Sequence, residues 1–563
     1  MGHINDVDES CDLQASDDLG SGTGSMRSRS HASRLPAELL TLIFREMQLL
    51  HGWNKSHSRP GSRQWLRVTW VCRYWREVAL SAPALWSFIQ SASACTDHAF
   101  VEAALERARR VPLNIDLTFV SHGEKAPSLL ASLFVHSQRI QVMRLQMLLE
   151  TRTMQLFFES MSASRLEMPL LECLSIADRA VDDADGAPLP YLPHLTREQV
   201  PRLHTLRLCF AHFPWNSSIY SSLFSLDLVS VRTPPTIEEF LNILRECPGL
   251  WMLHVDDALP RVDLAHQPLP EDRSVVILPS LERMSLTGEY PTIAYICDLL
   301  WVPCECEVDI EYNNSRGVSA DPVEALIPAA LPRQHVFREV VPSATLLSLR
   351  SEVLVSVEDD EDRISLVHLD FITGEGQHSS VRFDSACGGE TDIDADSWLQ
   401  LLHTFRRAPL TNVNFAPIDT ITQVMWRALF HRFPMLDAIE VGASHSQYET
   451  EPEDMHGAIP FLQALYELSP DGRNLSAPNL QCLTMKDFPV NADIVARLRW
   501  LVQTRKAAGK PLKRLTLDDM VFLDGIKSDT VVAYLKEADP DLVISVTSDE
   551  SQLCLLNAAA GNG

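Results

Sequence analysis

Two short segments carry side chains of the types that bind metal ions. Cys304 and Cys306 are thiols two residues apart, and Asp392, Asp394 and Asp396 alternate like the acids of a calcium loop. Neither set is complete. No further Cys or His follows the thiols at a usual spacing, and the aspartates lack the glycine and glutamate of positions six and twelve. We interpret the thiols as one face of a short strand and the aspartates as a solvated loop, and we expect no metal.

Short catalytic motifs are also missing from the sequence. Its 19 histidines are dispersed without H-E-x-x-H spacing, there is no G-x-S-x-G, and Gly20-Ser-Gly-Thr-Gly24 lacks the Gly-Lys-Ser/Thr ending of a phosphate-binding loop. The chain is therefore predicted not to be an enzyme and to need no cofactor. An enzyme assembled from distant residues stays open as an alternative, and it would need a deep pocket with clustered titratable groups.

Charge is distributed unevenly along the 563 residues. The formal net charge is −27, yet residues 27–110 hold 13 basic against six acidic residues, and 111–563 carry −28. An acidic chain repels phosphate backbones and anionic lipid, so we expect no nucleic-acid or membrane partner and a bias toward basic protein partners. Such binding should depend on salt. The basic segment indicates a separate module with a partner of its own.

The N-terminus has acids where a targeting peptide needs bases, and no stretch approaches the roughly 20 apolar residues of a membrane span. The 12 cysteines are scattered without a C-x-x-C pair, and in a reducing compartment we expect most of them to be buried small apolar residues. We therefore expect a soluble protein of the cytoplasm, the nucleus or both.

The elements that carry the basic module are predicted to be helices. Apolar residues recur at helical spacing over Leu35–Met47, and Pro36 stands in the first turn, where its missing N–H is harmless. After a polar stretch at 51–63, Val68, Val71, Cys72, Trp75, Val78 and Ala79 are expected to line one helical face within 65–80. A third helical turn is expected to start at Pro83.

This segment resembles an F-box. The resemblance lies in Leu35-Pro-Ala-Glu-Leu-Leu-Thr-Leu-Ile-Phe44, Val71-Cys-Arg-Tyr-Trp-Arg-Glu-Val-Ala79 and Ser81-Ala-Pro-Ala-Leu-Trp86, and it covers about 52 residues. The Pro-x-Leu-Trp ending is similar to that of F-box-like proteins abundant in mushroom-forming fungi. The polar insert 51–63 is longer than the turn of many F-boxes.

The resemblance implies docking on a Skp-type adaptor and, through it, on a cullin. By motif position, the adaptor face and its supporting core would consist of Leu35, Pro36, Leu39, Leu40, Ile43, Phe44, Val71, Cys72, Trp75, Val78, Pro83, Leu85 and Trp86. Three short helices cannot hide this many apolar side chains by themselves, which favours a partner. The alternative is a three-helix cap that shields the end of the following domain without any partner.

A repeating L-x-x-L-x-L unit follows the module and resembles leucine-rich repeats. Each unit predicts one short parallel strand with a helix on the outer face. The units are Ile140/Met143/Leu145, Leu171/Leu174/Ile176, Leu203/Leu206/Leu208, Leu223/Leu226/Leu228, Leu250/Leu253/Val255, Leu281/Met284/Leu286, Leu410/Val413/Phe415, Leu436/Ile439/Val441, Leu480/Leu483/Met485 and Leu512/Leu515/Leu517.

The repeat departs from its strict form eight residues after the first Leu. Where the consensus has Asn or Cys to bond the turn, this chain has Ala211, Val231, Ala258, Phe488 and Met520, among others. The sequence therefore predicts an irregular solenoid without that side-chain ladder. A generic α/β domain with amphipathic strands is the alternative.

The expected fold class is α/β, a three-helix F-box followed by an irregular leucine-rich-repeat-like solenoid. The predicted domains are a disordered tail 1–33, the F-box 34–90, a first solenoid half 91–330, an irregular segment with a β-hairpin 331–400, a second half 401–547 and a frayed tail 548–563.

As implied by the resemblance, the expected function is a non-catalytic substrate receptor of an SCF (Skp–cullin–F-box) ubiquitin ligase, with a target protein held by the repeats. The alternative is a repeat scaffold that never enters a ligase.

Overall fold

The computed structural model divides into two compact units, Met1–Trp86 and Ser87–Gly563. The residues it describes are 35–52, 63–91, 97–120, 126–148, 167–178, 195–231, 233–260, 275–314, 341–355, 363–373, 376, 378–385, 395–416, 418, 421–443, 457–466, 475–523 and 525–548. Outside these ranges lie Asp392, Asp394, the acidic run 358–362 and the predicted tail 1–33. Of the predicted tail 548–563, only residue 548 is described.

The first unit is helical. Its elements are α1 (Ala37–Gly52), the 3-10 helix η2 (Arg63–Trp70), α2 (Arg73–Ser81) and α3 (Pro83–Trp86). The amide of Leu40 donates to the carbonyl of Pro36 at 3.1 Å, so α1 begins directly after the proline. The predicted helical turn at Pro83 is confirmed.

One continuous helical face over 65–80 is a wrong prediction. The chain leaves η2 at Trp70, and Cys72 has extended backbone and caps α2, accepting a bond from the Trp75 amide at 3.5 Å. Val71 lies in this break and is 60% exposed, whereas Val78 and Ala79 are buried. Periodicity could not detect the break because the apolar spacing continues across it.

The second unit is built on one 18-stranded sheet in which most neighbours run parallel. Successive pairings connect its strands in the order β1, β2, β3, β4, β5, β6, β7, β9, β11, β14, β13, β12, β15, β16, β17, β19, β20, and β18 pairs with β19. The small strands β8 (Val276–Ile277) and β10 (Leu300–Trp301) form a separate parallel pair. The bounds of the others are β1 Phe88–Ser91, β2 Leu113–Val120, β3 Ile140–Leu148, β4 Cys173–Asp178, β5 Thr205–Cys209, β6 Ser225–Val229, β7 Met252–Asp256, β9 Arg283–Gly288, β11 Glu307–Asn314, β12 Ala344–Val355, β13 Arg363–Thr373, β14 His378–Ser385, β15 Asn412–Ala416, β16 Ala438–Gly442, β17 Cys482–Lys486, β18 Pro489–Val490, β19 Arg514–Phe522 and β20 Val543–Ser548.

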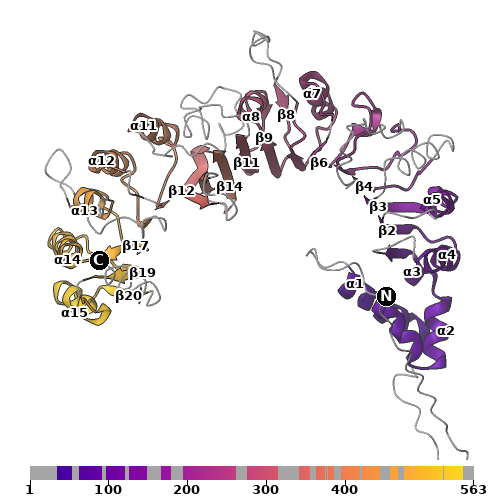
Figure 1. Ribbon diagram of the computed structural model, residues 1–563, viewed down its shortest axis with the longest axis horizontal. Coiled ribbons are helices and arrows are strands. Elements are labelled where there is room, and N and C mark those ends of the chain that lie inside the picture. The colour runs from indigo at the N-terminus through magenta and orange to yellow at the C-terminus, as the bar shows by residue number, and fades with distance from the viewer. Residues whose placement is uncertain are drawn as a thin grey trace, which may run out of the picture. The chain divides into compact units, whose positions relative to one another are not determined.

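The described helices of this unit lie along one face of the sheet (Figure 1). They are α4 His98–Arg107, α5 Ala126–Phe134, α7 Ile237–Arg245, α8 Tyr290–Cys297, α11 Ala395–Thr404, α12 Gln423–Arg432, α13 Ala458–Tyr466, α14 Ala492–Ala507 and α15 Ser528–Ala538, with short 3-10 turns η3 Ser137–Arg139, η4 Ser218–Tyr220 and η5 Val341–Ser343. Helix α7 begins with a capping box between Thr236 and Glu239. The predicted α/β class with parallel strands and helices is thus confirmed.

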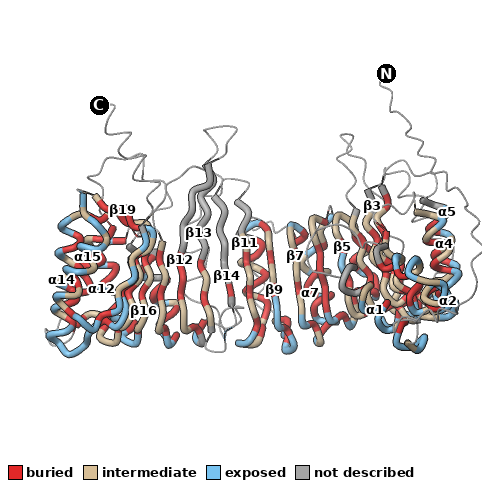
Figure 2. The backbone as a smooth tube through the Cα atoms, turned by 90° about the horizontal axis from the view of Figure 1, so that it is seen from below, coloured by how far each residue is buried: buried red, intermediate tan, exposed pale blue. Residues whose placement is uncertain are grey.

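The apolar residues of the predicted L-x-x-L-x-L units form rows across neighbouring strands. Leu226 pairs in register with Leu206 on one side and Leu253 on the other, and all three are fully buried. Figure 2 shows the resulting alternation of buried and less buried positions along the strands. Each row is completed only by its neighbours, so the core forms by stacking of strands.

The turn after many strands is made by the backbone. Seven residues after the first Leu, Phe210, Ser230, Asp257 and Asp487 have positive φ values between 46° and 59°. Their amides donate to a carbonyl of the next strand at 2.6 to 3.1 Å. The following residue is then free to point inward, and Val231, Ala258 and Phe488 are buried there. This is the physical substitute for the Asn or Cys that the sequence lacks.

The predicted β-hairpin is confirmed for its described residues and belongs to the sheet. β12 and β13 pair antiparallel from Ala344/Thr373 to Val355/Arg363, and β14 adds a third antiparallel strand. β14 also pairs parallel with β11, and β12 pairs parallel with β15. These three strands therefore join the two series of parallel strands into one sheet.

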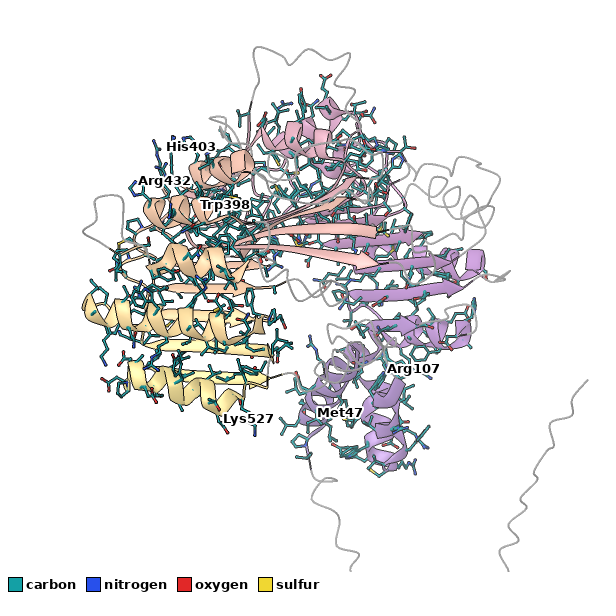
Figure 3. All side chains as sticks on the ribbon, turned by 60° about the vertical axis from the view of Figure 1, so that its left-hand side comes forward. Met47, Arg107, Trp398, His403, Arg432 and Lys527 are labelled. Carbon is teal, nitrogen blue, oxygen red and sulfur yellow. The ribbon has the colours of Figure 1, made fainter. Side chains whose placement is uncertain are left out.

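Aromatic side chains fill the core beneath α11 and α12. The Trp398 indole N–H donates to the Met425 carbonyl at 3.0 Å, and its ring lies 5.1 Å from that of Phe415 (Figure 3). Trp426 packs edge-on against Phe415 at 5.6 Å. None of the described helices is long and apolar enough to cross a membrane.

Candidate functional site

The structure does not support the strand predicted around the paired cysteines. Cys304 and Glu305 form a turn and β11 starts only at Glu307, so the two thiols do not share a strand face. Cys304 is exposed, whereas Cys306 is buried and burial raises its thiol pKa to about 12. Within the described ranges, no group of three or more His, Cys, Asp and Glu residues could hold a metal ion.

The thirteen residues predicted for adaptor binding all lie in described parts of the first unit, and their burial divides them. Five form its interior: Leu40, Phe44, Val78, Leu85 and Trp86. Four are exposed: Pro36, Leu39, Ile43 and Val71. The remaining four are half-buried: Leu35, Cys72, Trp75 and Pro83. The structure therefore separates supporting core from accessible surface, which the sequence alone could not do.

Aromatic contacts and buried hydrogen bonds hold the three helices of this unit together. The Phe44 and Trp75 rings lie 5.2 Å apart and join α1 to α2, while Trp65 meets Trp86 edge-on at 5.3 Å. The Trp86 indole N–H donates to the Ala79 carbonyl at 2.9 Å. The buried Gln48 amide donates to the Leu85 carbonyl at 2.8 Å, so α1 and α3 are bonded as well. These contacts fix the orientation of α1.

Helix α1 has more apolar surface than the unit buries. Leu40, Phe44 and Gln48 recur every four residues and face the interior. Leu39 and Ile43 are also four residues apart, yet they remain 47% and 42% exposed. Leu42 is exposed as well. We call Leu39, Leu42 and Ile43 the open face of α1.

A second apolar surface lies where η2 gives way to α2. Trp70 is 75% exposed, and Val71 beside it is also open. The Tyr74 hydroxyl donates to the Leu35 carbonyl at 2.9 Å, which places the first turn of α2 beside the start of α1. The Trp70–Val71 junction therefore lies near the N-terminal end of α1, in the same small unit as the open face.

Sequence reasoning missed three exposed apolar residues: Leu42, Trp70 and Leu80. Leu42 lies within the apolar pattern of Leu35–Met47 but is not among the thirteen residues predicted for adaptor binding. Counting apolar residues around the helix would have found it, because they cover far more than the one stripe that a single packing contact needs.

The charges around this surface are screened by solvent. Arg73 and Glu77 form an ion pair at 2.9 Å, but both side chains are exposed and such pairs contribute little to stability. The Arg76 guanidinium donates to the Thr69 carbonyl at 2.8 Å and closes the η2–α2 break. Basic groups thus border the apolar surface without entering it.

The fold defines a class, a mixed α/β protein with a long, largely parallel sheet and a separate small helical unit. No protein-family model matches the chain, and no curated protein matches it by sequence.

Proposed function

We propose that the chain is the non-catalytic substrate-recognition subunit of an SCF-type ubiquitin ligase. The first unit would act as the F-box and dock a Skp-type adaptor, which in turn binds the cullin. The second unit would act as the leucine-rich-repeat-like solenoid and hold a target protein. The ubiquitin-transfer chemistry would belong to other subunits.

The open face of α1 is the observation that carries the proposal. Two leucines and an isoleucine on one helix remain exposed although the same helix buries Leu40 and Phe44 in the interior of the unit. Exposing large apolar side chains is unfavourable in a monomer, and burying one is worth about 1.5–3 kcal/mol. A partner that packs a helix or groove against this face would recover that free energy.

The arrangement of the second unit supports a receptor role. Helices cover one face of its sheet (Figure 1), and strands present alternate side chains on the other. Residues in the middle of that face are Arg144, Ser175, Arg207, Asp227, His254 and Ser285, one from each successive strand. A row of varied polar side chains on neighbouring strands suits recognition of an extended protein surface.

Co-purification of the full chain with a Skp-type adaptor tests the proposal. We expect a stoichiometric complex with the wild-type protein. Replacing Leu39 and Ile43 together by Asp should weaken it at least about 30-fold, because two charges would be buried against an apolar partner. Both residues are exposed, so the variant should keep its folded structure.

The control is Val424→Asp, which places one such charge at an exposed apolar position of α12 in the second unit. It should bind the adaptor like the wild type. Equal losses in both variants, or no complex with folded wild-type protein, would overturn the proposal. The second result would favour a scaffold that acts outside any ligase.

A further inference from the structure

A row of four side chains, three of them exposed and one half-buried, lies at the start of strands β5, β6, β7 and β9. His204, Phe224, Trp251 and Glu282 each immediately precede a strand. The amide of each of the last three donates to the carbonyl of the residue before it in this row, at 2.8 to 2.9 Å. The four residues therefore occupy equivalent positions on neighbouring strands, about 4.8 Å apart. We call them the edge row.

Three of the four side chains in the edge row are aromatic, and two of these, Phe224 and Trp251, are exposed while His204 is half-buried. The His204 and Phe224 rings stack at 5.6 Å with an angle of 21° between them. Phe224 is 50% exposed and Trp251 is 42% exposed. In the second series of parallel strands, the equivalent residues Thr411, Asp437, Gln481 and Lys513 are all polar. The aromatic rings are thus confined to one stretch of the sheet edge.

Carboxylates with spare hydrogen-bonding capacity lie in the edge row itself, at Glu282, and further along the same strands, at Asp227 and Asp256. Glu282 is exposed and Asp256 half-buried, and neither side chain forms an ion pair or hydrogen bond among the described residues. Asp227 accepts from Arg207 through Oδ2 at 3.1 Å, but its buried Oδ1 has no partner in the described structure. Asp227 lies three residues beyond Phe224 on the same strand, about 10 Å away.

Each arginine on these strands already pairs with a carboxylate, and His254 on β7 acts electrostatically on Asp227. Arg207 is already paired with Asp227, and Arg283 is paired with Glu307 at 2.9 Å. Residues 111–563 as a whole carry a formal charge of −28. Exposed aromatic faces attract guanidinium and ammonium groups, and the Glu282 carboxylate in the same row provides a counter-charge.

We propose that the edge row is a docking site for an arginine-rich extended segment of a partner protein. A guanidinium would stack on Trp251 or Phe224 while a neighbouring arginine pairs with Glu282. The inference extends the proposed function by giving the chemistry of the target. The two proposals can be tested separately, because peptide binding to the second unit requires no adaptor.

The test measures fluorescence anisotropy of a fluorescein-labelled nonapeptide of alternating Gly and Arg, titrated with the full chain. We expect saturable binding that weakens as salt rises. Trp251→Ala should weaken binding about tenfold, equivalent to ~1.4 kcal/mol. The control Trp500→Ala removes an exposed tryptophan of α14 and should change the affinity less than twofold.

A second pair of variants tests the charges without removing a ring. Glu282→Gln should weaken binding about threefold, whereas Asp529→Asn, an exposed position on α15, should have no effect. If Trp251→Ala does not fold, as judged by its thermal transition, this second pair decides the question. Each edge-row variant should still co-purify with the adaptor like the wild type.

Several outcomes would overturn the proposal. They are no binding of the arginine peptide, equal binding of a Gly-Glu nonapeptide, or equal losses in the Trp251 and Trp500 variants. Aromatic rows also stack nucleic-acid bases, so labelled decauridine is included as a probe. Binding of decauridine in preference to the peptide would replace the basic protein segment with single-stranded RNA.

Discussion

Helices α1 and α7 both carry apolar residues at helical spacing. The two units differ in how many of those side chains they bury. In α7, Phe240, Leu241, Ile243 and Leu244 are all buried. In α1, Leu40 is buried while Leu39 beside it is open. The sheet gives α7 a wide surface to cover, and the small helical unit offers α1 only a narrow one.

The difference shows how unit size decides what an apolar residue does. A small unit buries a smaller fraction of its chain than a large one, so part of its apolar surface remains available to a partner. Stacked strands bury their apolar rows within the chain itself. The same residue type therefore contributes to stability in the second unit and is available for association in the first.

Leu253→Ala should have the largest effect on stability. Leu253 is fully buried between Leu226 and Met284 on adjacent strands, so its truncation leaves a cavity and should cost about 3 kcal/mol. Urea unfolding followed by circular dichroism measures the change. A loss below about 1 kcal/mol would contradict close packing of the row.

Thr236→Ala should have a smaller effect on the same unit. It removes the hydroxyl oxygen that accepts from the Glu239 amide at 3.3 Å in the capping box of α7. The backbone amide of residue 236, which donates to Glu239 Oε2 at 2.8 Å, is kept. We expect a loss of about 1 kcal/mol in the same urea assay. Thr236→Ser keeps the hydroxyl and is the control, and equal losses in both variants would contradict a capping role.

Leu39→Ala should have the smallest effect on stability. Together with Leu253→Ala it compares the same substitution at an exposed and at a buried position. The substitution is chemically identical, but Leu39 is about half exposed, so the free energy of unfolding should change by less than about 0.5 kcal/mol. Adaptor affinity should nevertheless fall measurably. A stability loss as large as that of Leu253→Ala would mean that the open face of α1 belongs to the core.

Much of the fold follows from local patterns in the sequence. Each L-x-x-L-x-L unit predicted one short parallel strand, and the units that start at Leu203, Leu223 and Leu250 are present as β5, β6 and β7. These signals are strong because strand and helix have different periods. The short strand β1, with four residues, lacked enough length to show a period.

Periodicity in the sequence could not predict which distant strands pair with one another. The sequence indicated a hairpin within 351–371, but not that β14 would join it to β11 while β12 joined it to β15. Such contacts depend on strands far apart in the chain, and no local pattern encodes their order. The break at Val71 was missed for a related reason, because apolar spacing records a face but not the backbone bonds that end a helix.

By itself, the sequence determined the α/β class, the positions of the apolar rows and the motif blocks that resemble an F-box, since these depend on residue type and spacing. Only the tertiary structure decided which residues of those blocks are open. Leu39 and Leu40 are adjacent and chemically identical, and their different exposure comes from the direction in which α1 is held by Phe44, Trp75 and Gln48. Burial is a property of neighbours in space, so it is settled only when the helices pack.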